Sequence, residues 1–282
     1  MPELPEVETI VGGLKGFLIG QKISSIKFLD RKRFVGDEKK IIGQKILDIK
    51  RRAKLIIIKL ENNQNIVIHL KMTGQLIFKD KTHRIAGGHQ SRELFIEVPN
   101  IHTRIIFDLS GGGKLFYNDL IRYGTIRVLK DDEVDKMTKG EFGPEPFSDE
   151  FNKEYLSMIA QKNKSSNIKK ILMDQALIAG VGNIYANEAL YLAGIDPSRK
   201  SASLSEGEIS SLYNAILQSL KLGVKQQGAS IRNYVNHEGK KGTMQNYFKV
   251  YDKAGQKCDC GGLVKKIQLN GRGTYYCPAC QS

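Results

Sequence analysis

The amino-acid sequence predicts an α+β protein with three parts: an N-terminal helix with an antiparallel β domain, a helical domain, and a C-terminal cysteine hairpin. Three observations support this prediction. Residues 22–129 contain short β-rich runs, residues 150–223 have the apolar spacing of helices, and four cysteines lie in two close pairs near the end of the chain. With 282 residues, 40% of them hydrophobic, the chain can build separate cores in about two domains.

The first predicted element is a helix directly after Pro2. Pro5 suits the first turn of a helix, and the acidic Glu6 and Glu8 suit its positive N-terminal end. Apolar residues follow with helical spacing at Ile10, Val11, Leu14, Phe17 and Leu18. The N-terminal amine would therefore be held beside an ordered element.

The next region is predicted to be antiparallel β structure. Residues 54–60 and 65–70 form one hairpin around a turn at 61–64, and residues 104–109 and 114–118 form another around 110–113. This pattern is compatible with a sandwich or a barrel.

A polar segment separates the β region from the helices. Residues 131–150 include Gly-Pro-Glu-Pro at 143–146, which continues neither a strand nor a helix, so a linker is expected there. Candidate helices follow at 150–161, 168–175, 186–193 and 205–223, and a polar glycine-containing loop at 228–247. The predicted division is therefore a domain at 1–130, a linker at 131–150, a helical domain at 151–227, a loop region at 228–250 and a cysteine module at 251–282.

The charge balance favours a polyanionic partner. Lys and Arg number 44 against 30 acidic residues, a formal net charge of +14, which suits nucleic acid or an anionic membrane surface. No run approaches the roughly 18 to 20 apolar residues of a membrane span, and the N-terminus is acidic where a signal peptide would be basic. We therefore expect a cytoplasmic protein that does not enter the membrane.

The four cysteines predict a metal site. Cys258 and Cys260 form one pair, Cys277 and Cys280 the other, and the residues between the pairs read as a hairpin with Asn-Gly at its turn. A reducing compartment favours one structural Zn²⁺ on four thiolates, with reduced cysteines or a disulfide as alternatives. With the metal in place, Lys265, Lys266 and Arg272 would form a basic finger facing phosphate, and solvated surface charge is the alternative.

Pro2 is a candidate nucleophile. Removal of Met1 would leave a secondary amine able to attack the anomeric carbon of a deoxyribose, expel the base and form an iminium. Glu3 would shuttle protons to the sugar and the leaving group. Because many chains begin with Pro-Glu, this pattern needs support from the rest of the sequence.

That support comes from six motifs: MPELPEVE at 1–8, RRAK at 51–54, HLKMTG at 69–74, GPEP at 143–146, AGVGNIYANEAL at 179–190 and GRGTYYCPAC at 271–280. Over its whole length the chain resembles the formamidopyrimidine-DNA glycosylase family. The resemblance implies an N-terminal helix plus β-sandwich domain, a helical domain with a helix-two-turns-helix element, and a C-terminal zinc finger.

The resemblance also implies catalytic roles for five residues. Pro2 would be the nucleophile, Glu3 the proton donor at base excision, and Glu6 a further acidic residue of the same motif. Lys54 would supply the cation at β-elimination, and Arg272 the donor at δ-elimination.

Further residues match DNA-binding positions of the family. Asn183 resembles its phosphate-binding asparagine, with a helix cap as the alternative, and His69 matches a phosphate contact that could instead be structural. Met72 matches the side chain that enters the base stack when the damaged nucleotide is flipped out, whereas a buried core methionine is the alternative. Lys164, with Lys169 and Lys170, would extend the basic surface or simply be solvated.

Three departures from the family pattern affect specificity. Ile121 stands where the family has an arginine that reads the orphaned base, while Arg122 is retained and Tyr123 can still stack in the gap. In the segment Ile101–Arg104, His102 keeps one candidate phosphate contact. The stretch 79–100 is longer than usual, and no function can be assigned to it.

The loop at 228–247 is expected to form the lesion pocket, with Ser230 and Tyr247 reading a flipped purine. The leading hypothesis is a monomeric bifunctional glycosylase and lyase that excises oxidised purines, such as 8-oxoguanine and formamidopyrimidines, from double-stranded DNA at the nucleoid. The alternatives are a relative of the endonuclease VIII branch acting on oxidised pyrimidines, and a catalytically silent DNA-binding homologue.

Overall fold

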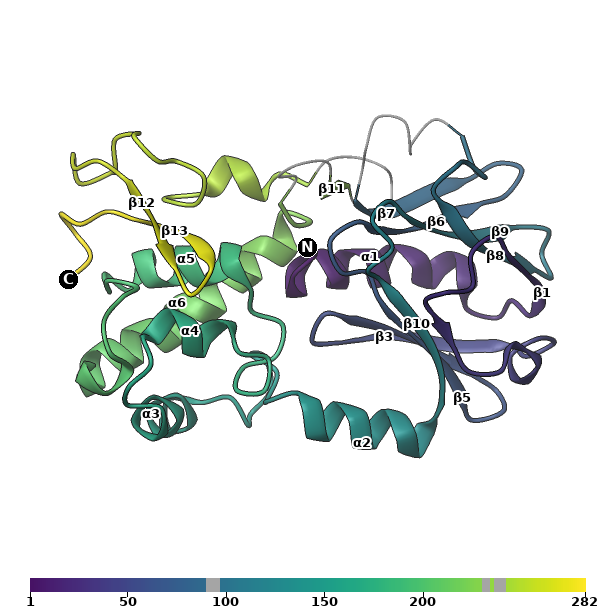
Figure 1. The fold of residues 1–282 in the computed structure, drawn as a ribbon, viewed down its shortest axis with the longest axis horizontal. Helices are drawn as coiled ribbons and strands as arrows, with labels where there is room; N and C mark the ends of the chain where they lie inside the picture. Colours follow the sequence, from purple (N-terminus) through teal and green to yellow (C-terminus); the bar gives the residue numbers. More distant parts are fainter. Residues whose placement is uncertain (90–96, 230–233, 236–241) are drawn as a thin grey trace. The chain divides into compact units, whose positions relative to one another are not determined.

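The computed structural model describes residues 1–89, 97–229, 234–235 and 242–282 (Figure 1). The chain divides into two compact units. The first contains residues 1–139 and 223–245, and the second contains residues 140–222 and 246–282. Within the described residues, none of the helices combines the length and apolar character that a membrane span requires.

The first unit begins with the predicted N-terminal helix, α1 (Leu4–Leu18). Pro5 lies in its first turn, and the carboxylate of Glu6 accepts a hydrogen bond from the backbone N–H of Glu3 at 2.9 Å, which satisfies a donor that the helix itself leaves open. The apolar stripe of α1, from Val7 to Leu18, is buried in the main hydrophobic core together with side chains of both sheets. Burial of this stripe fixes the helix, and with it the N-terminal residues.

Two sheets pack on this core, which confirms the β-sandwich. The six-stranded sheet has the order β1-β8-β9-β6-β7-β11, and the five-stranded sheet has the order β2-β10-β5-β4-β3. All neighbouring strands run antiparallel except β2 and β10. The strands are β1 (Ile23–Phe28), β2 (Phe34–Val35), β3 (Ile46–Arg52), β4 (Leu55–Leu60), β5 (Gln64–His69), β6 (Gly74–Lys79), β7 (Arg84–His89), β8 (Thr103–Leu109), β9 (Lys114–Asp119), β10 (Thr125–Lys130) and β11 (Tyr234–Val235).

The sequence pattern identified the β4–β5 and β8–β9 hairpins but gave no role to residues 79–100. This stretch supplies β7, which pairs with β6 on one side and with β11 on the other. Part of the polar loop 228–247 thus extends the six-stranded sheet.

The segment 131–150, predicted as a linker, is partly helical. Helix α2 (Asp131–Glu141) occupies its first half. The run Asp131, Asp132 and Glu133 suits the positive end of a helix, and the Glu133 carboxylate accepts a hydrogen bond from the backbone N–H of Lys130 at 2.7 Å. The polarity of this segment therefore reflects an exposed helix as well as a loop.

The second unit contains the remaining helices and the cysteine hairpin. The helices are α3 (Lys153–Lys162), α4 (Ile168–Met173), α5 (Asn183–Leu192) and α6 (Glu206–Lys225), the last of which ends in the first unit. The side chains of Asn152 and Asn167 cap α3 and α4 by accepting from the backbone N–H groups of Tyr155 and Lys170. Short 3-10 helices lie at Glu38–Lys40, Ser201–Ser203 and Met244–Tyr247.

The last two strands, β12 (Lys265–Leu269) and β13 (Arg272–Tyr276), form the predicted hairpin. Its turn is Asn270-Gly271, and both residues have positive φ angles, 51° and 71°. Asn-Gly is favoured in such a turn because both residues tolerate this left-handed backbone conformation. Arg272 follows the turn directly.

Candidate active site and zinc finger

The N-terminal residues of the first unit form a buried cluster. Pro2 is buried, as are Glu3 and Glu6, while Met1 is exposed. Glu6 binds two backbone donors, because one carboxylate oxygen accepts from Glu3 and the other accepts from the N–H of Ala229 at 2.8 Å. Glu6 therefore connects the start of α1 to the root of the 228–247 loop.

Lys54 lies in the turn between β3 and β4 and is almost fully buried. The turn is held from two sides by Arg51, whose guanidinium donates to the carbonyl of Ala53 at 3.1 Å and to the Glu8 carboxylate on α1 at 2.7 Å. Ala53 has a positive φ of 51°, so the chain reverses sharply just before Lys54. The helix that follows Glu3 and the turn that contains Lys54 are thus joined by the ion pair between Glu8 and Arg51.

His69 ends β5 and lies opposite Leu55, next to Lys54 in the chain. Its Nδ1 accepts a hydrogen bond from the backbone N–H of Lys71 at 3.0 Å, which leaves the proton on Nε2. Burial, together with the smaller effect of the charges on Lys71 and Lys54, lowers the pKa of His69 to about 3. His69 is therefore a neutral hydrogen-bond donor at physiological pH.

Two neighbouring loops of the first unit carry exposed apolar side chains. We call residues 70–73, between β5 and β6, and residues 120–124, between β9 and β10, the wedge loops. Met72 is 48% exposed, Ile121 42% and Tyr123 59%. The interpretation of Met72 as a core residue is therefore wrong. His102 lies close by, since its carbonyl accepts from the backbone N–H of Asp119 at 3.0 Å.

In the second unit, Asn183 is the first residue of α5, but its side chain does not cap that helix. Its Nδ2 donates to the carbonyl of Gly273 at 3.1 Å, and its Oδ1 is buried without a hydrogen-bond partner in the part of the chain that the structure describes. Gly273 follows Arg272, so Asn183 helps to fix the strand that presents this arginine.

Lys169 corrects one prediction. Instead of extending the basic surface, it is fully buried and its ammonium donates to Thr274 Oγ1 at 2.7 Å and to the Gly273 carbonyl at 3.3 Å. Lysine is almost always exposed, so no sequence signal pointed to this role. Lys164 and Lys170 are exposed, as a basic surface requires. Tyr247 is exposed at the end of its 3-10 helix, and Ser230 lies outside the described residues.

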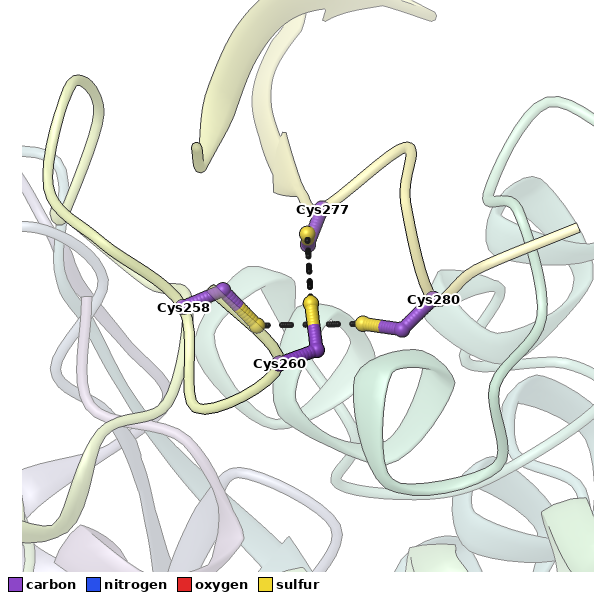
Figure 2. A group of neighbouring side chains, drawn as sticks. All are labelled: Cys258, Cys260, Cys277 and Cys280. Atoms are coloured by element: carbon purple, nitrogen blue, oxygen red, sulfur yellow. Dashed lines mark hydrogen bonds between the residues drawn. The ribbon is translucent and has the colours of Figure 1, made fainter. Parts of the chain in front are cut away.

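The four cysteines of the second unit come together from two segments of the chain, and their sulfur atoms point toward one another (Figure 2). The four sulfurs lie within 4.8 Å of one another, with Cys258–Cys280 and Cys260–Cys277 separations of 3.7 and 3.6 Å. A disulfide would need about 2.0 Å. Zinc bonded tetrahedrally at about 2.3 Å would need sulfurs about 3.8 Å apart. The arrangement, including the one-residue spacing of the first pair, suits one structural Zn²⁺.

One face of α5 supports this cluster. The hydroxyl of Tyr191 lies 3.3 Å from Cys258 Sγ, and the Asn187 side chain accepts from the backbone N–H of Tyr275 at 2.9 Å. Glu188 is buried and accepts three backbone N–H groups, those of Lys249, Val250 and Tyr251, at 2.8 to 3.1 Å. Burial raises the pKa of Glu188, and these three donors oppose that shift.

Comparison with known families and structures agrees with this description. Residues 1–126 match the formamidopyrimidine-DNA glycosylase N-terminal domain, residues 142–235 its H2TH domain, and residues 255–282 the zinc finger found in FPG and IleRS. The formamidopyrimidine-DNA glycosylase of Carboxydothermus hydrogenoformans is 38% identical over 287 residues and that of Streptococcus mutans 37% over 290, with 100% of this chain and 99 to 100% of each relative covered.

Solved structures give the same result. Lactococcus lactis Fpg in complex with DNA that contains an abasic site is 34% identical, with a TM-score of 0.87 and 99% of both chains covered. A point mutant of that protein, in complex with Fapy-dG DNA, is 33% identical, with a TM-score of 0.88 and full coverage of both chains. The fold and the four-cysteine finger thus define a DNA-repair glycosylase that acts on damaged DNA. The chain belongs to the formamidopyrimidine-DNA glycosylase family.

Proposed function

We propose that this glycosylase excises oxidised purines through a covalent bond to Pro2 and then cuts the strand by β- and δ-elimination. The observation that supports this most directly is the burial of Pro2 just before α1, beside Glu3 and Glu6 and next to an exposed Met1, whose removal would free the amine. A nucleophilic amine needs a fixed position and an adjacent proton carrier, and this cluster offers both.

In the proposed reaction the nitrogen of Pro2 bonds to C1′ of the flipped nucleotide as the glycosidic bond breaks and the base leaves with its electron pair and a proton. Glu3 transfers protons to the sugar oxygen and the leaving group, so that the ring opens to an iminium. The iminium draws electrons from C2′, which loses a proton, and the 3′ phosphate leaves. A second elimination, in which C4′ loses a proton, expels the 5′ phosphate, and water then hydrolyses the C1′–N bond of the iminium to release Pro2.

Lys54 and Arg272 supply positive charge for the two phosphate departures. The ion pair between Arg51 and Glu8 supports the placement of Lys54, and the bonds from Asn183 and Lys169 to Gly273 support the placement of Arg272. A cation placed beforehand stabilises a leaving phosphate without having to reorganise during the reaction. The proposed role of Glu6 is to hold the backbone of Glu3 and Ala229 in place through its two carboxylate oxygens.

The proposed substrate is double-stranded DNA with one oxidised base. The protein would bind it as a monomer, at the nucleoid in the cytoplasm. Neutral His69, His102, Arg122, Lys164 and Asn183 would contact phosphates, and Met72 and Tyr123 would enter the stack left by the flipped nucleotide. The Lactococcus lactis complexes with Fapy-dG and abasic-site DNA support a damaged duplex as the ligand. We retain Ser230 and Tyr247 as candidates for reading the flipped base, and the five-part domain division as a proposal.

Ile121 is exposed on the second wedge loop and carries no hydrogen-bond donor on its side chain. An aliphatic side chain cannot distinguish a cytosine edge from the other bases through paired hydrogen bonds, so we propose weak discrimination of the base opposite the lesion. The same residue supports activity on oxidised pyrimidines as a second candidate function.

Borohydride trapping on a panel of single-lesion duplexes tests the proposal. Each oxidised purine and pyrimidine is placed opposite each of the four bases, and mass spectrometry locates the adduct. We expect trapping at Pro2, preference for purine lesions, and rates that differ less than tenfold between opposite bases, since the extra donor pair that would add about 1–3 kcal/mol is missing. Pro2→Gly should lose most of the adduct while still binding abasic DNA. A normal adduct in this variant, or retained Met1 with full activity, would contradict the mechanism.

A further inference from the structure

The carboxylate of Asp119, at the end of β9, is a buried hydrogen-bonding centre in the first unit. Its side chain is 1% exposed and accepts from three donors: the hydroxyl of Thr73, the phenol of Tyr117 at 3.2 Å and the backbone N–H of Gly124 at 2.8 Å. Burial and the adjacent Asp119 charge raise the pKa of Tyr117, so its phenol remains a donor. Nothing in the proposed chemistry uses this carboxylate.

Thr73 connects Asp119 to the second wedge loop. Its hydroxyl donates to Asp119 and at the same time accepts from the backbone N–H of Ile121 at 3.1 Å. Thr73 belongs to the loop that carries Met72, whereas Ile121 and Gly124 belong to the loop that carries Tyr123. One threonine and one aspartate thus join the two loops through three hydrogen bonds, two of them to a charged acceptor.

The two sheets bring these loops together. Strand β5 pairs with β10 through His69 and Thr125, and β6 pairs with β9 through Gly74 and Asp119, so both connections cross between the sheets side by side. The backbone is also closely packed where each loop meets the next strand. A Cβ at Gly124 would lie 2.0 Å from the phenol oxygen of Tyr117, and a Cβ at Gly74 would lie 2.4 Å from the carbonyl of Leu70. Both positions therefore require glycine, because any side chain there would collide with buried groups.

We propose that Thr73 and Asp119 are positioning residues that lock the wedge loops into a single rigid unit, so that Met72 and Tyr123 enter the DNA stack together. Separating stacked bases costs a few kcal/mol per step. A flexible loop would use part of the binding free energy to order itself during insertion. A loop that is already fixed by buried hydrogen bonds leaves that free energy available for separating the bases. The inference rests on the proposed insertion of Met72.

The experiment compares Thr73→Val, which keeps the shape but removes the hydroxyl, with Thr73→Ser, which keeps the hydroxyl. Base extrusion is followed by stopped-flow fluorescence of 2-aminopurine placed beside an oxidised purine, and single-turnover excision is measured on the same duplex. Elimination at a preformed abasic site in single-stranded DNA serves as the internal control, because no base has to be unstacked there.

We expect Thr73→Val to slow extrusion and excision by about 10- to 100-fold, as loss of a hydrogen bond to a buried charge implies, with less than threefold change in single-strand elimination. Thr73→Ser should restore both rates to within threefold of the unmodified protein. Unchanged extrusion in Thr73→Val would overturn the proposal, and so would an equal loss in single-strand elimination.

Two further measurements separate the possible failures. If Met72→Ala extrudes the base normally, the insertion role of Met72 is wrong; if Met72→Ala is impaired while Thr73→Val is normal, only the locking role is wrong. Hydrogen exchange is measured on the wild-type protein, so this test does not depend on whether a variant folds. The amides of Ile121 and Gly124 should be protected because both are bonded to this pair, and exchange at the rate of an open loop would overturn the proposal.

Discussion

The wedge loops and the finger hairpin, which is β12 and β13 with the four cysteines, are two exposed structures that buried groups stabilise in different ways. In the finger, four thiolates from two short segments converge on one ion site, and a face of α5 binds the adjoining backbone. In the wedge loops, a single buried carboxylate and one threonine hydroxyl make the connections. Metal binding in such fingers contributes about 10–16 kcal/mol, whereas each hydrogen bond to a charge contributes about 1.5–3 kcal/mol.

This difference predicts different modes of failure. A finger that depends on one ion should lose its structure in an all-or-none way when a ligand is removed. The wedge loops should weaken step by step as individual hydrogen bonds are removed.

The largest effect is expected from Cys277→Ser. Loss of one of four thiolates should abolish stoichiometric zinc and reduce affinity for abasic-site DNA by more than about tenfold, because the basic hairpin loses its framework. Zinc is measured by atomic emission and affinity by fluorescence anisotropy. Asp259→Asn, which changes a neighbour outside the cysteine set, is the matched control and should keep its zinc. Wild-type zinc content and affinity in Cys277→Ser would refute the dependence of the finger on this site.

Asp119→Ala should destabilise the first unit by about 3–5 kcal/mol, because it leaves buried donors from Thr73, Tyr117 and Gly124 without their acceptor. Urea unfolding, followed by hydrogen exchange of residues 1–130, measures the loss. Zinc content should not change. Loss of zinc in the same variant would show that the wedge loops and the finger are not structurally independent.

Glu188→Gln tests the support of the finger apart from its metal. The amide keeps one acceptor oxygen but places an N–H₂ group against backbone donors of Lys249, Val250 and Tyr251, at a cost of about 1–3 kcal/mol. Zinc release to a chelator should become several-fold faster, while the protein should still contain one zinc per chain before the chelator is added. Release at the wild-type rate would show that α5 does not stabilise the finger.

The smallest effect concerns pH. His69 titrates near 6.5 when unfolded but at about 3 when folded, so the unfolded state binds an extra proton between these values. Its contribution to stability is present above pH 6.5 and declines as the pH falls toward 3, by about 1 kcal/mol at pH 5.5. In urea titrations from pH 7 to 5, His69→Asn should lose less stability than the wild type. Parallel pH profiles would mean that burial of His69 is not the cause.

The sequence identified most of the elements because their patterns are local. Helix α1 was marked by Pro5 and an apolar stripe, and the cysteine hairpin by its thiol pairs and the Asn-Gly turn. Helix α2 was missed because its acidic, polar sequence resembles a linker when the bonds of its first turn are not visible. Strand β7 was missed because its glycine-containing pattern lacks the alternation of an ordinary strand.

The candidate site was predictable where a residue type itself carries the chemistry. Pro2, Glu3 and the cysteines belong to this group, and Lys54 and Asn183 were reached through motifs. The buried contacts of Lys169 and Thr73 were not predicted, because they are made with partners far along the chain, Gly273 and Asp119, that only the fold brings near them. A polar residue in a motif does not reveal whether its side chain faces solvent or a buried acceptor.

The face of α5 has a consequence for protein engineering. Asn183, Asn187, Glu188 and Tyr191 recur at the spacing of one helix face, and each contacts the chain between Lys249 and Tyr275. The finger is therefore not expected to fold when it is transferred to another protein without α5. A graft of residues 246–282 onto another scaffold would need to bring this helix with it, or a designed replacement for its four side chains.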